Sequence, residues 1–138
     1  MKYFDYICKD DLERIFLKEP EDFSAKTEKD VLKYALGAFL YVPATQYNMI
    51  YKSIIGDVKG VRPLAICLED AVGVNGELEA IENLRLILKN ISNESITNKD
   101  GIPLIFVRIK DVEQLLRIKE IIIKNSHFIT GILIPKAN

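Results

Sequence analysis

Four short and uninterrupted apolar runs constrain the fold of this chain more than any other feature. They are "AFLYVP" from residue 38, "PLAICL" from residue 63, "IPLIFVRI" from residue 102 and "TGILIP" from residue 130. Runs of this length and continuity are typical of strands buried on both faces, whereas half-buried strands alternate apolar and polar residues. We therefore expect four strands inside a sheet.

Between the runs, apolar residues recur at helical spacing. The segments are "ATQYNMIYKSII", "NGELEAIENLRLILKN" and "DVEQLLRIKEIIIKN". In the second segment we expect Leu78, Ile81, Leu84 and Leu88 to form the apolar face of a helix. Strands that alternate with helices predict an α/β fold with a parallel sheet and right-handed crossovers.

Two architectures fit this order of elements, a doubly wound open sheet and a TIM barrel. The first run is followed by "YVPATQYN", which lacks the glycine-rich phosphate loop of a dinucleotide-binding fold. A complete barrel needs eight strands and about 250 residues. The 138 residues of this chain hold four strands, so we expect a partial TIM barrel, the first four parallel strands with their intervening helices.

The first 36 residues have a different pattern. "DDLERIF" spaces its apolar residues like one face of a helix that ends before Pro20, and "TEKDVLKYAL" follows as a second short helix. We expect a short helical extension over residues 1–36 and a half-barrel domain over residues 37–138.

Composition excludes several classes of function. The net charge of −1 gives no general attraction for nucleic acid or for an anionic membrane. No window resembles a membrane span or a signal peptide, so we expect a cytoplasmic protein. Cys8 and Cys67 stand far apart and there is one histidine, His127, which argues against a disulfide framework or a zinc site.

Charged side chains follow the apolar runs at the point where each expected strand ends. Glu69 and Asp70 follow the second run, Arg108 ends the third, and Lys136 follows the fourth. In βα folds the functional groups gather at these carboxyl ends. Arg108 suits a substrate carboxylate, and the two acids suit proton transfer or a divalent metal.

Structural explanations exist for the same residues. An acid before a helix is often an N-cap, and Arg108 and Glu69 could simply pair across adjacent strands. A thiol enzyme using Cys67 has little support, because period-two alternation places Cys67 on the same side of its strand as Glu69. A neighbouring carboxylate raises a thiol's pKa, which is the wrong direction for a nucleophile.

The order of "AFLYVPA", "ICLEDAV", "IFVRI" and "GILIPK" resembles the citrate lyase β-subunit-like group of the HpcH/HpaI aldolase superfamily. Within that group it is most similar to the C–C bond lyase branch found beside stress- and tellurium-resistance operons. The resemblance spans roughly residues 37 to 136. It departs at Gly37-Ala38 and at Pro43-Ala44, where many members carry Arg-Ser and Pro-Gly, which weakens the case for a thioester substrate.

The resemblance implies a TIM-barrel lyase that uses Mg²⁺ to polarise the carbonyl of an oxo-acid or acyl-thioester. It implies catalytic roles for Glu69 and Asp70 and a grip on the substrate carboxylate by Arg108, with Lys136 as a further substrate-binding residue. The family's main metal ligands stand on strands five and six. We therefore expect this chain to be an inactive half that does not bind Mg²⁺ by itself.

Two further expectations concern partners. A four-stranded sheet has two apolar edges that are seldom left bare, so we expect a homo-oligomer that forms through those edges. The alternative to a lyase is a non-catalytic scaffold, in which the charges at the strand ends bind a small anion or a partner protein.

Overall fold

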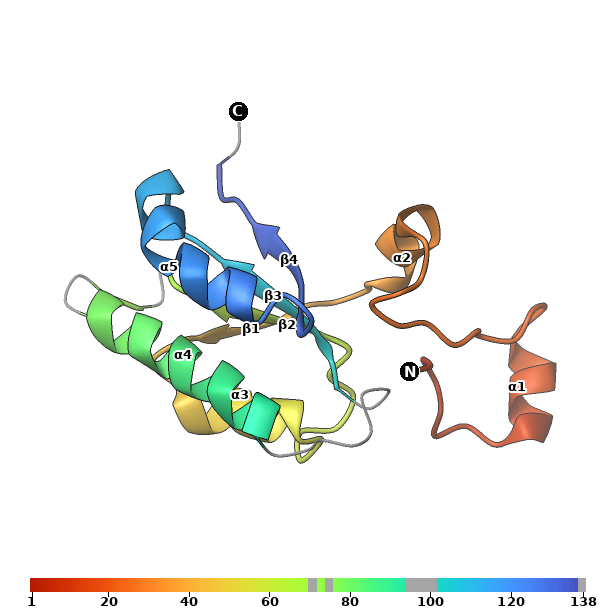
Figure 1. Ribbon diagram of the computed structural model, residues 1–138. Coiled ribbons are helices and arrows are strands. Elements are labelled where there is room, and N and C mark those ends of the chain that lie inside the picture. The colour runs from red at the N-terminus through yellow and green to blue at the C-terminus, as the bar shows by residue number, and fades with distance from the viewer. Residues whose placement is uncertain (70–71, 74–75, 94–101, 137–138) are drawn as a thin grey trace. The chain divides into compact units, whose positions relative to one another are not determined.

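The computed structural model of the protein (Figure 1) divides into two compact units, Met1–Ala35 and Leu36–Asn138. The structure describes residues 1–69, 72–73, 76–93 and 102–136. The expected domain boundary after residue 36 stays a prediction, since a domain must also fold by itself.

The elements of the larger unit alternate along the chain between strand and helix. The smaller unit contains α1 (Lys9–Ile15) and α2 (Lys29–Ala35). The larger unit contains β1 (Leu40–Pro43), α3 (Tyr47–Ile54), β2 (Pro63–Cys67), α4 (Glu77–Asn93), β3 (Leu104–Arg108), α5 (Val112–Lys124) and β4 (Ile129–Leu133).

The four strands form one open sheet in the order β1-β2-β3-β4, and every neighbouring pair is parallel. In the central register, Ile66 of β2 lies between Val42 of β1 and Val107 of β3. This order follows the chain without a reversal, as it does when successive strands of a barrel are laid side by side. The predicted α/β fold with four parallel strands is confirmed.

Helices α3, α4 and α5 lie on one face of the sheet (Figure 1). Strand residues that point to this face, such as Leu64, Ile66 and Val107, are completely buried. They pack in one apolar cluster with helix residues, among them Leu84 of α4 and Ile118 of α5. The core of the larger unit therefore lies between the sheet and its three helices.

The expectation that all four strands are buried on both faces is right for β2 and wrong for the edges of the sheet. Every residue of β2 is buried, whereas all residues of β4 are only half-buried and Tyr41 of β1 is 50% exposed. Strands β1 and β4 each have one paired neighbour among the described strands, so less of their surface is covered.

The apolar face of α4 also differs from the one expected. Leu78 is 82% exposed, and the buried stripe instead passes through Leu84 and Leu88 with Ala80 and Ile87. Leu78 stands six residues before Leu84, about one and two-thirds turns, so the two side chains leave the helix on different sides. Spacing alone placed Leu78 on the wrong side of the stripe.

The smaller unit is held by aromatic contacts and by the chain's amino group. The N-terminal ammonium of Met1 donates a hydrogen bond to the carbonyl of Phe23 at 2.8 Å. The ring of Tyr3 stacks on Phe23 with centroids 5.3 Å apart, and Phe4 packs against Phe16 at 5.1 Å. These contacts close a small apolar cluster within residues 1–35.

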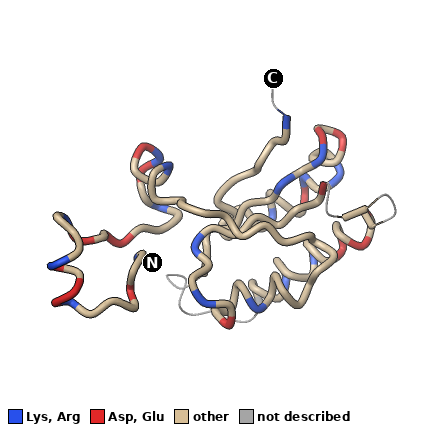
Figure 2. The backbone as a smooth tube through the Cα atoms, turned by 180° about the vertical axis from the view of Figure 1, so that it is seen from behind, with Lys and Arg blue, Asp and Glu red and all other residues tan. Residues whose placement is uncertain are grey.

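Charge is distributed unevenly between the layers of the larger unit. Acidic and basic residues lie mainly on helices and loops, while the strands carry few of them (Figure 2). Within the described residues, no helix is both long enough and apolar enough to cross a membrane.

Candidate active site at the strand tips

Backbone hydrogen bonds tie the carboxyl ends of the four strands together. The N–H of Ala44 donates to the carbonyl of Cys67 at 2.9 Å, and the N–H of Leu68 donates to the carbonyl of Arg108 at 2.8 Å. The N–H of Ile109 donates to Leu133 in β4 at 3.2 Å. The first residues after β1, β2 and β3 are therefore still held by backbone hydrogen bonds, which fix the backbone from which their side chains extend.

Glu69 follows β2 and lies within this fixed region. Its side chain is only 7% exposed, and Oε2 lies 2.5 Å from Nη2 of Arg108, which ends β3. Oε1 lies 3.8 Å from Nζ of Lys136, whose side chain is 81% exposed. The structure therefore brings together three of the four residues expected at the site, while Asp70 lies outside the described residues.

The contact between Glu69 and Arg108 is an ion pair by distance but not a well-directed hydrogen bond. Among the described residues, no N–H group meets Oε2 at a hydrogen-bonding angle, although the atom is buried. The guanidinium at 2.5 Å nevertheless compensates the buried charge of this oxygen.

Lys136 reaches Glu69 from an unusual backbone conformation. Its φ angle of 50° is in the left-handed region, which a residue with a Cβ atom seldom adopts. The lysine head is exposed, so its attraction to Glu69 is screened by water and contributes little to stability.

Tyr41 was not expected at this site. The guanidinium carbon of Arg108 lies 5.8 Å from the centre of the Tyr41 ring, within range of a cation–π contact. Period-two alternation could have found it, since Tyr41 pairs in register with Ala65, two residues before Cys67 on the same side of the sheet.

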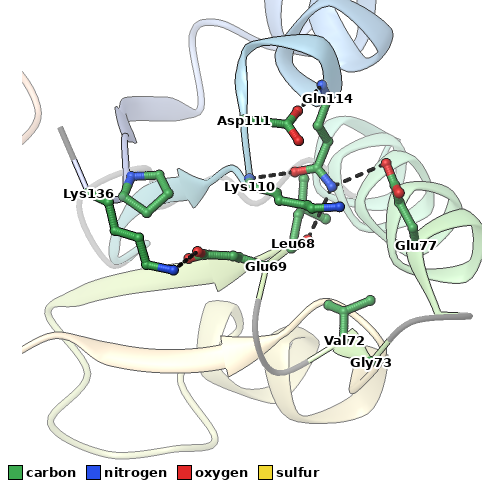
Figure 3. Close-up of a pocket in the computed structure, with 10 residues that line it drawn as sticks. Leu68, Glu69, Val72, Gly73, Glu77, Lys110, Asp111, Gln114 and Lys136 are labelled. Carbon is green, nitrogen blue, oxygen red and sulfur yellow. Dashed lines mark hydrogen bonds and ion pairs between the residues drawn. The ribbon is translucent and has the colours of Figure 1, made fainter. Parts of the chain in front are cut away.

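A pocket of about 560 Å³ opens beside Glu69, between the ends of the strands and the starts of α4 and α5 (Figure 3). Its wall includes Glu69, Lys110, Gln114 and Lys136. Figure 3 shows Lys136 directed toward Glu69 on one side of the pocket, with Gln114 facing Glu77 on the other. The pocket therefore has a buried acid and exposed ammonium groups in its lining.

Gln114 fixes one wall of this pocket. Its amide donates to the carbonyl of Leu68 at 3.1 Å and to Oε1 of Glu77 at 3.3 Å, and its own oxygen accepts from the N–H of Lys110 at 2.8 Å. The residue is 2% exposed. It joins the tip of β2, the first turn of α4 and the turn before α5, so the residue that precedes Glu69 is held in place.

The sequence contained a signal for Gln114 that the spacing of charges did not reveal. Asp111 and Gln114 stand three apart at the start of α5, as in a capping box. Asp111 is indeed the N-cap of α5, and its Oδ1 accepts a hydrogen bond from the N–H of Gln114 at 2.8 Å. The Gln114 side chain, however, binds Lys110 and Leu68 rather than the cap residue itself.

Glu77 connects the pocket to the outer surface of α5. Its Oε1 lies 3.2 Å from Nη1 of Arg117, and Nη2 of Arg117 donates to Glu113 at 2.6 Å. The hydrogen bond to Glu113, together with the charges of Glu113 and Glu77, raises the pKa of Arg117. Arg117 thereby neutralises an acid that lines the pocket.

The described residues do not suit Mg²⁺ by themselves. Mg²⁺ takes oxygen ligands, commonly one or two carboxylates together with water and substrate. Glu69 offers one carboxylate, and it lies between the cations of Arg108 and Lys136, which repel a further cation. In the described part of the chain, no three residues of the types His, Cys, Asp and Glu are grouped to hold a metal.

What the cluster can do chemically follows from its groups. Arg108 presents a guanidinium that matches a carboxylate, and Glu69 presents an oxygen that can accept a proton. The structural alternative is also visible, because Glu69 and Arg108 do pair across adjacent strands. Such a pair is compatible with a ligand-free binding site as well as with a purely structural contact.

Comparison with known proteins adds the family. Searches of curated proteins and of solved structures each returned no match. A family model described as C–C bond lyase of the TIM-barrel fold matches residues 30–138, which include all four strands and the whole cluster around Glu69. The open parallel sheet with its helices on one face agrees with a partial barrel of that fold. The chain therefore belongs to the family of C–C bond lyases of the TIM-barrel fold.

Proposed function

We propose that this chain is the N-terminal half of a citrate lyase β-subunit-like enzyme of the HpcH/HpaI superfamily, with a small oxo-acid or its thioester as substrate. The observation that carries the proposal is the buried Glu69 carboxylate against Arg108 at the strand tips, where barrels gather their chemistry. The family match supports the reaction class.

In this proposal Arg108 binds the substrate carboxylate and Glu69 acts on a substrate proton. In an aldol-type cleavage a base takes the hydroxyl proton, a carbonyl forms, and the electron pair of the broken C–C bond moves into an enolate. Nearby cations stabilise the enolate oxygen, and Lys136 is the exposed cation closest to Glu69 in the described cluster. Asp70, next in sequence, would share the catalytic role.

We further propose that the complete enzyme uses Mg²⁺ and that this chain by itself does not hold it. The support is electrostatic, since Glu69 lies between two cations. When bound, Mg²⁺ would polarise the carbonyl of the substrate. Residues other than those described here would supply most of its ligands.

Calorimetry of substrate binding tests the role of Arg108. Pyruvate and oxaloacetate are titrated, with and without MgCl₂, into the wild-type chain, Arg108→Ala and Arg85→Ala. Arg85 is a matched control, because it is an exposed arginine that pairs with Glu82 on α4 at 3.3 Å. Loss of a charged hydrogen-bonded partner costs roughly 1.5–3 kcal/mol, so we expect Kd to rise about tenfold or more in Arg108→Ala and not in Arg85→Ala. Equal binding by all three proteins would contradict the proposed role of Arg108.

Turnover tests the proposal that this chain is an inactive half. The reference fold closes eight strands into a barrel, and the described part of this chain has four in an open array. We expect the chain to cleave a 4-hydroxy-2-oxo acid, which carries the hydroxyl that the proposed step deprotonates, no faster than buffer with the same Mg²⁺. Catalysis by the chain alone, lost in Glu69→Gln, would overturn this proposal while supporting the site.

We also propose that two copies associate through the edges of the sheet. Strands β1 and β4 each pair with one described neighbour, and Ile134, just beyond β4, is 64% exposed. Unpaired strand edges next to apolar side chains favour association with another chain.

Light scattering after gel filtration measures that association. Ile134→Lys should reduce the association between chains, because a charge at a strand edge opposes strand pairing. Leu116→Lys is the matched control, since Leu116 is 65% exposed on α5 rather than at an edge. A wild-type chain that elutes as a monomer at micromolar concentration would contradict the proposal.

A non-catalytic scaffold remains the second candidate function. It is favoured by the exposed ammonium groups of Lys110 and Lys136 in the pocket lining, where the acid Glu77 is already paired with Arg117. A scaffold of this kind binds a small anion or an acidic segment of a partner without turnover. Pyruvate binding by this chain without any cleavage of a 4-hydroxy-2-oxo acid, even in a longer protein with the same residues, would favour the scaffold.

The proposed compartment is the cytoplasm. Cys8 is an exposed thiol and Cys67 a buried one, and neither forms a disulfide in the described structure. Exposed thiols persist best in a reducing compartment.

A further inference from the structure

The face of the sheet opposite α3, α4 and α5, here called the opposite face, has its own pattern of side chains. Leu64 and Ile66 of β2 belong to the core, so the alternate residues Ala65 and Cys67 point to the opposite face. Ala65 is fully buried and Cys67 is 4% exposed, and both are small. On the opposite face, β2 therefore carries only small side chains, while its neighbours β1 and β3 carry large ones.

Aromatic rings from both sides meet over these small side chains. Phe39, just before β1, and Phe106 of β3 lie edge to face with centroids 5.0 Å apart, although β2 stands between their strands. The ring of Phe106 also lies against Gly131 of β4, where an added Cβ would come within 2.9 Å of it. Small residues at 65 and 131 make room for this aromatic floor.

Tyr41 extends the floor toward the strand tips. Its ring lies 5.9 Å from Phe39, and in register Tyr41 stands two residues before the row that contains Cys67 and Arg108. Strands β1 and β3 are two strand spacings apart, about 10 Å. Arg108 reaches the Tyr41 ring at 5.8 Å because its long side chain crosses β2 where the residues are small.

Arg108 is thus held from two directions by groups of different kinds. Glu69 contacts its Nη2 at 2.5 Å from the β2 tip, and the face of Tyr41 lies beside its guanidinium from β1. A carboxylate alone fixes a distance, whereas a ring also restricts the plane of a guanidinium. The plane of that group decides whether it can meet a ligand carboxylate with two parallel hydrogen bonds.

We propose that Tyr41 is a positioning residue for Arg108, and that it sets the guanidinium for a small oxo-acid whose apolar part lies on the floor formed by Phe39 and Phe106. This inference rests on the proposed function, in which Arg108 binds the substrate carboxylate. Tyr41 acts through Arg108 and takes no part in proton transfer.

The test combines a direct view of Arg108 with a measurement of binding. The Nε–Hε signal of Arg108, identified by its loss in Arg108→Lys, should show an upfield ring-current shift in the wild-type chain. We expect Tyr41→Phe, which retains the ring, to keep that shift, and Tyr41→Leu to lose it. In calorimetry with pyruvate, Kd should rise about threefold to fivefold in Tyr41→Leu and stay near the wild-type value in Tyr41→Phe.

Tyr51→Leu is the matched control, because Tyr51 is a tyrosine on α3 that stacks on Tyr47 on the helical side of the sheet. It should change neither the Arg108 signal nor the pyruvate Kd. An unshifted Arg108 signal in the wild type, or a Kd that Tyr41→Leu leaves unchanged while Arg108→Lys raises it, would overturn the positioning role alone. Pyruvate binding that Arg108→Lys leaves unchanged would instead overturn the proposed function.

Discussion

The two faces of strand β2 carry different kinds of residue, although they alternate along the same few positions. Toward the helices stand Leu64 and Ile66, which are fully buried among side chains of α3, α4 and α5. Toward the opposite face stand Ala65 and Cys67, and one step further Glu69 with its ion pair to Arg108. The helical face requires large apolar side chains that fill the core, whereas the opposite face requires small side chains and an ion pair.

This difference shows how a parallel strand can serve stability and chemistry together. The helical face gains free energy from apolar burial, which scales with area and depends little on the exact atoms. The opposite face must leave space for Arg108 and the aromatic floor, so large side chains are excluded from its centre. Substitutions at adjacent positions of β2 should therefore have different consequences.

The largest expected effect comes from the helical face. Ile66→Ala removes a fully buried side chain from the core and leaves a cavity, which typically costs about 2–5 kcal/mol of unfolding free energy. Cys67→Ala on the opposite face removes one sulfur atom and should cost about 1 kcal/mol. Urea denaturation followed by circular dichroism measures both, and equal losses would erase the contrast between the faces.

Removal of Arg108 breaks the opposite face instead. Arg108→Ala leaves Glu69, which is 7% exposed, as a buried carboxylate without its nearest cation. Loss of one partner of a buried pair costs about 3–5 kcal/mol, and the 27% exposure of Arg108 reduces this to about 2–3 kcal/mol. The double variant Glu69→Gln, Arg108→Ala should recover part of the loss, because it removes the unpaired charge. A double variant less stable than Arg108→Ala would contradict this account.

The helical face was the more predictable of the two from sequence. Continuous apolar runs such as "PLAICL" indicate a buried strand by hydrophobicity alone, and the buried β2 confirms this reading. Errors arose where burial depends on neighbours that a run does not reveal. Tyr41 is half exposed because β1 is an edge strand, and Leu78 is exposed because α4 turns its stripe away from it.

For the opposite face, sequence position predicted which charges would meet but not what surrounds them. Glu69, Arg108 and Lys136 were expected together because parallel strands end at one edge, and the structure brings them together. Their catalytic and binding roles stay predictions. Tyr41 and Gln114 were missed because each reaches the site from another element. The Tyr41 ring extends from β1 to Arg108, and the Gln114 amide extends from α5 to the Leu68 carbonyl.

Gln114→Ala tests whether the amide that bonds to the end of β2 contributes to both stability and ligand binding. The change removes the donor to the Leu68 carbonyl and the acceptor of the Lys110 N–H at a buried position. Buried polar groups left without partners cost about 1–3 kcal/mol of unfolding free energy. Because Leu68 precedes Glu69, this variant should also weaken pyruvate binding in calorimetry, whereas Ile66→Ala should keep that binding under conditions in which it is still folded. Full stability with unchanged binding would show that the amide is dispensable.

The smallest expected effect concerns the N-cap of α5, where a loss of stability can be separated from a loss of ligand binding. Asp111 caps α5 by accepting the N–H of Gln114 at 2.8 Å, so Asp111→Ala should lower the unfolding free energy by about 1 kcal/mol. Asp111→Asn retains a capping oxygen and should recover most of that loss. The Gln114 side chain keeps its bonds to Leu68 and Lys110 in both variants, and loss of the Asp111 charge from the pocket lining does not oppose an anion, so pyruvate binding should not weaken. If Asp111→Ala weakens binding as strongly as Gln114→Ala, the cap rather than the amide holds the β2 tip, and the turn before α5 belongs with the opposite face.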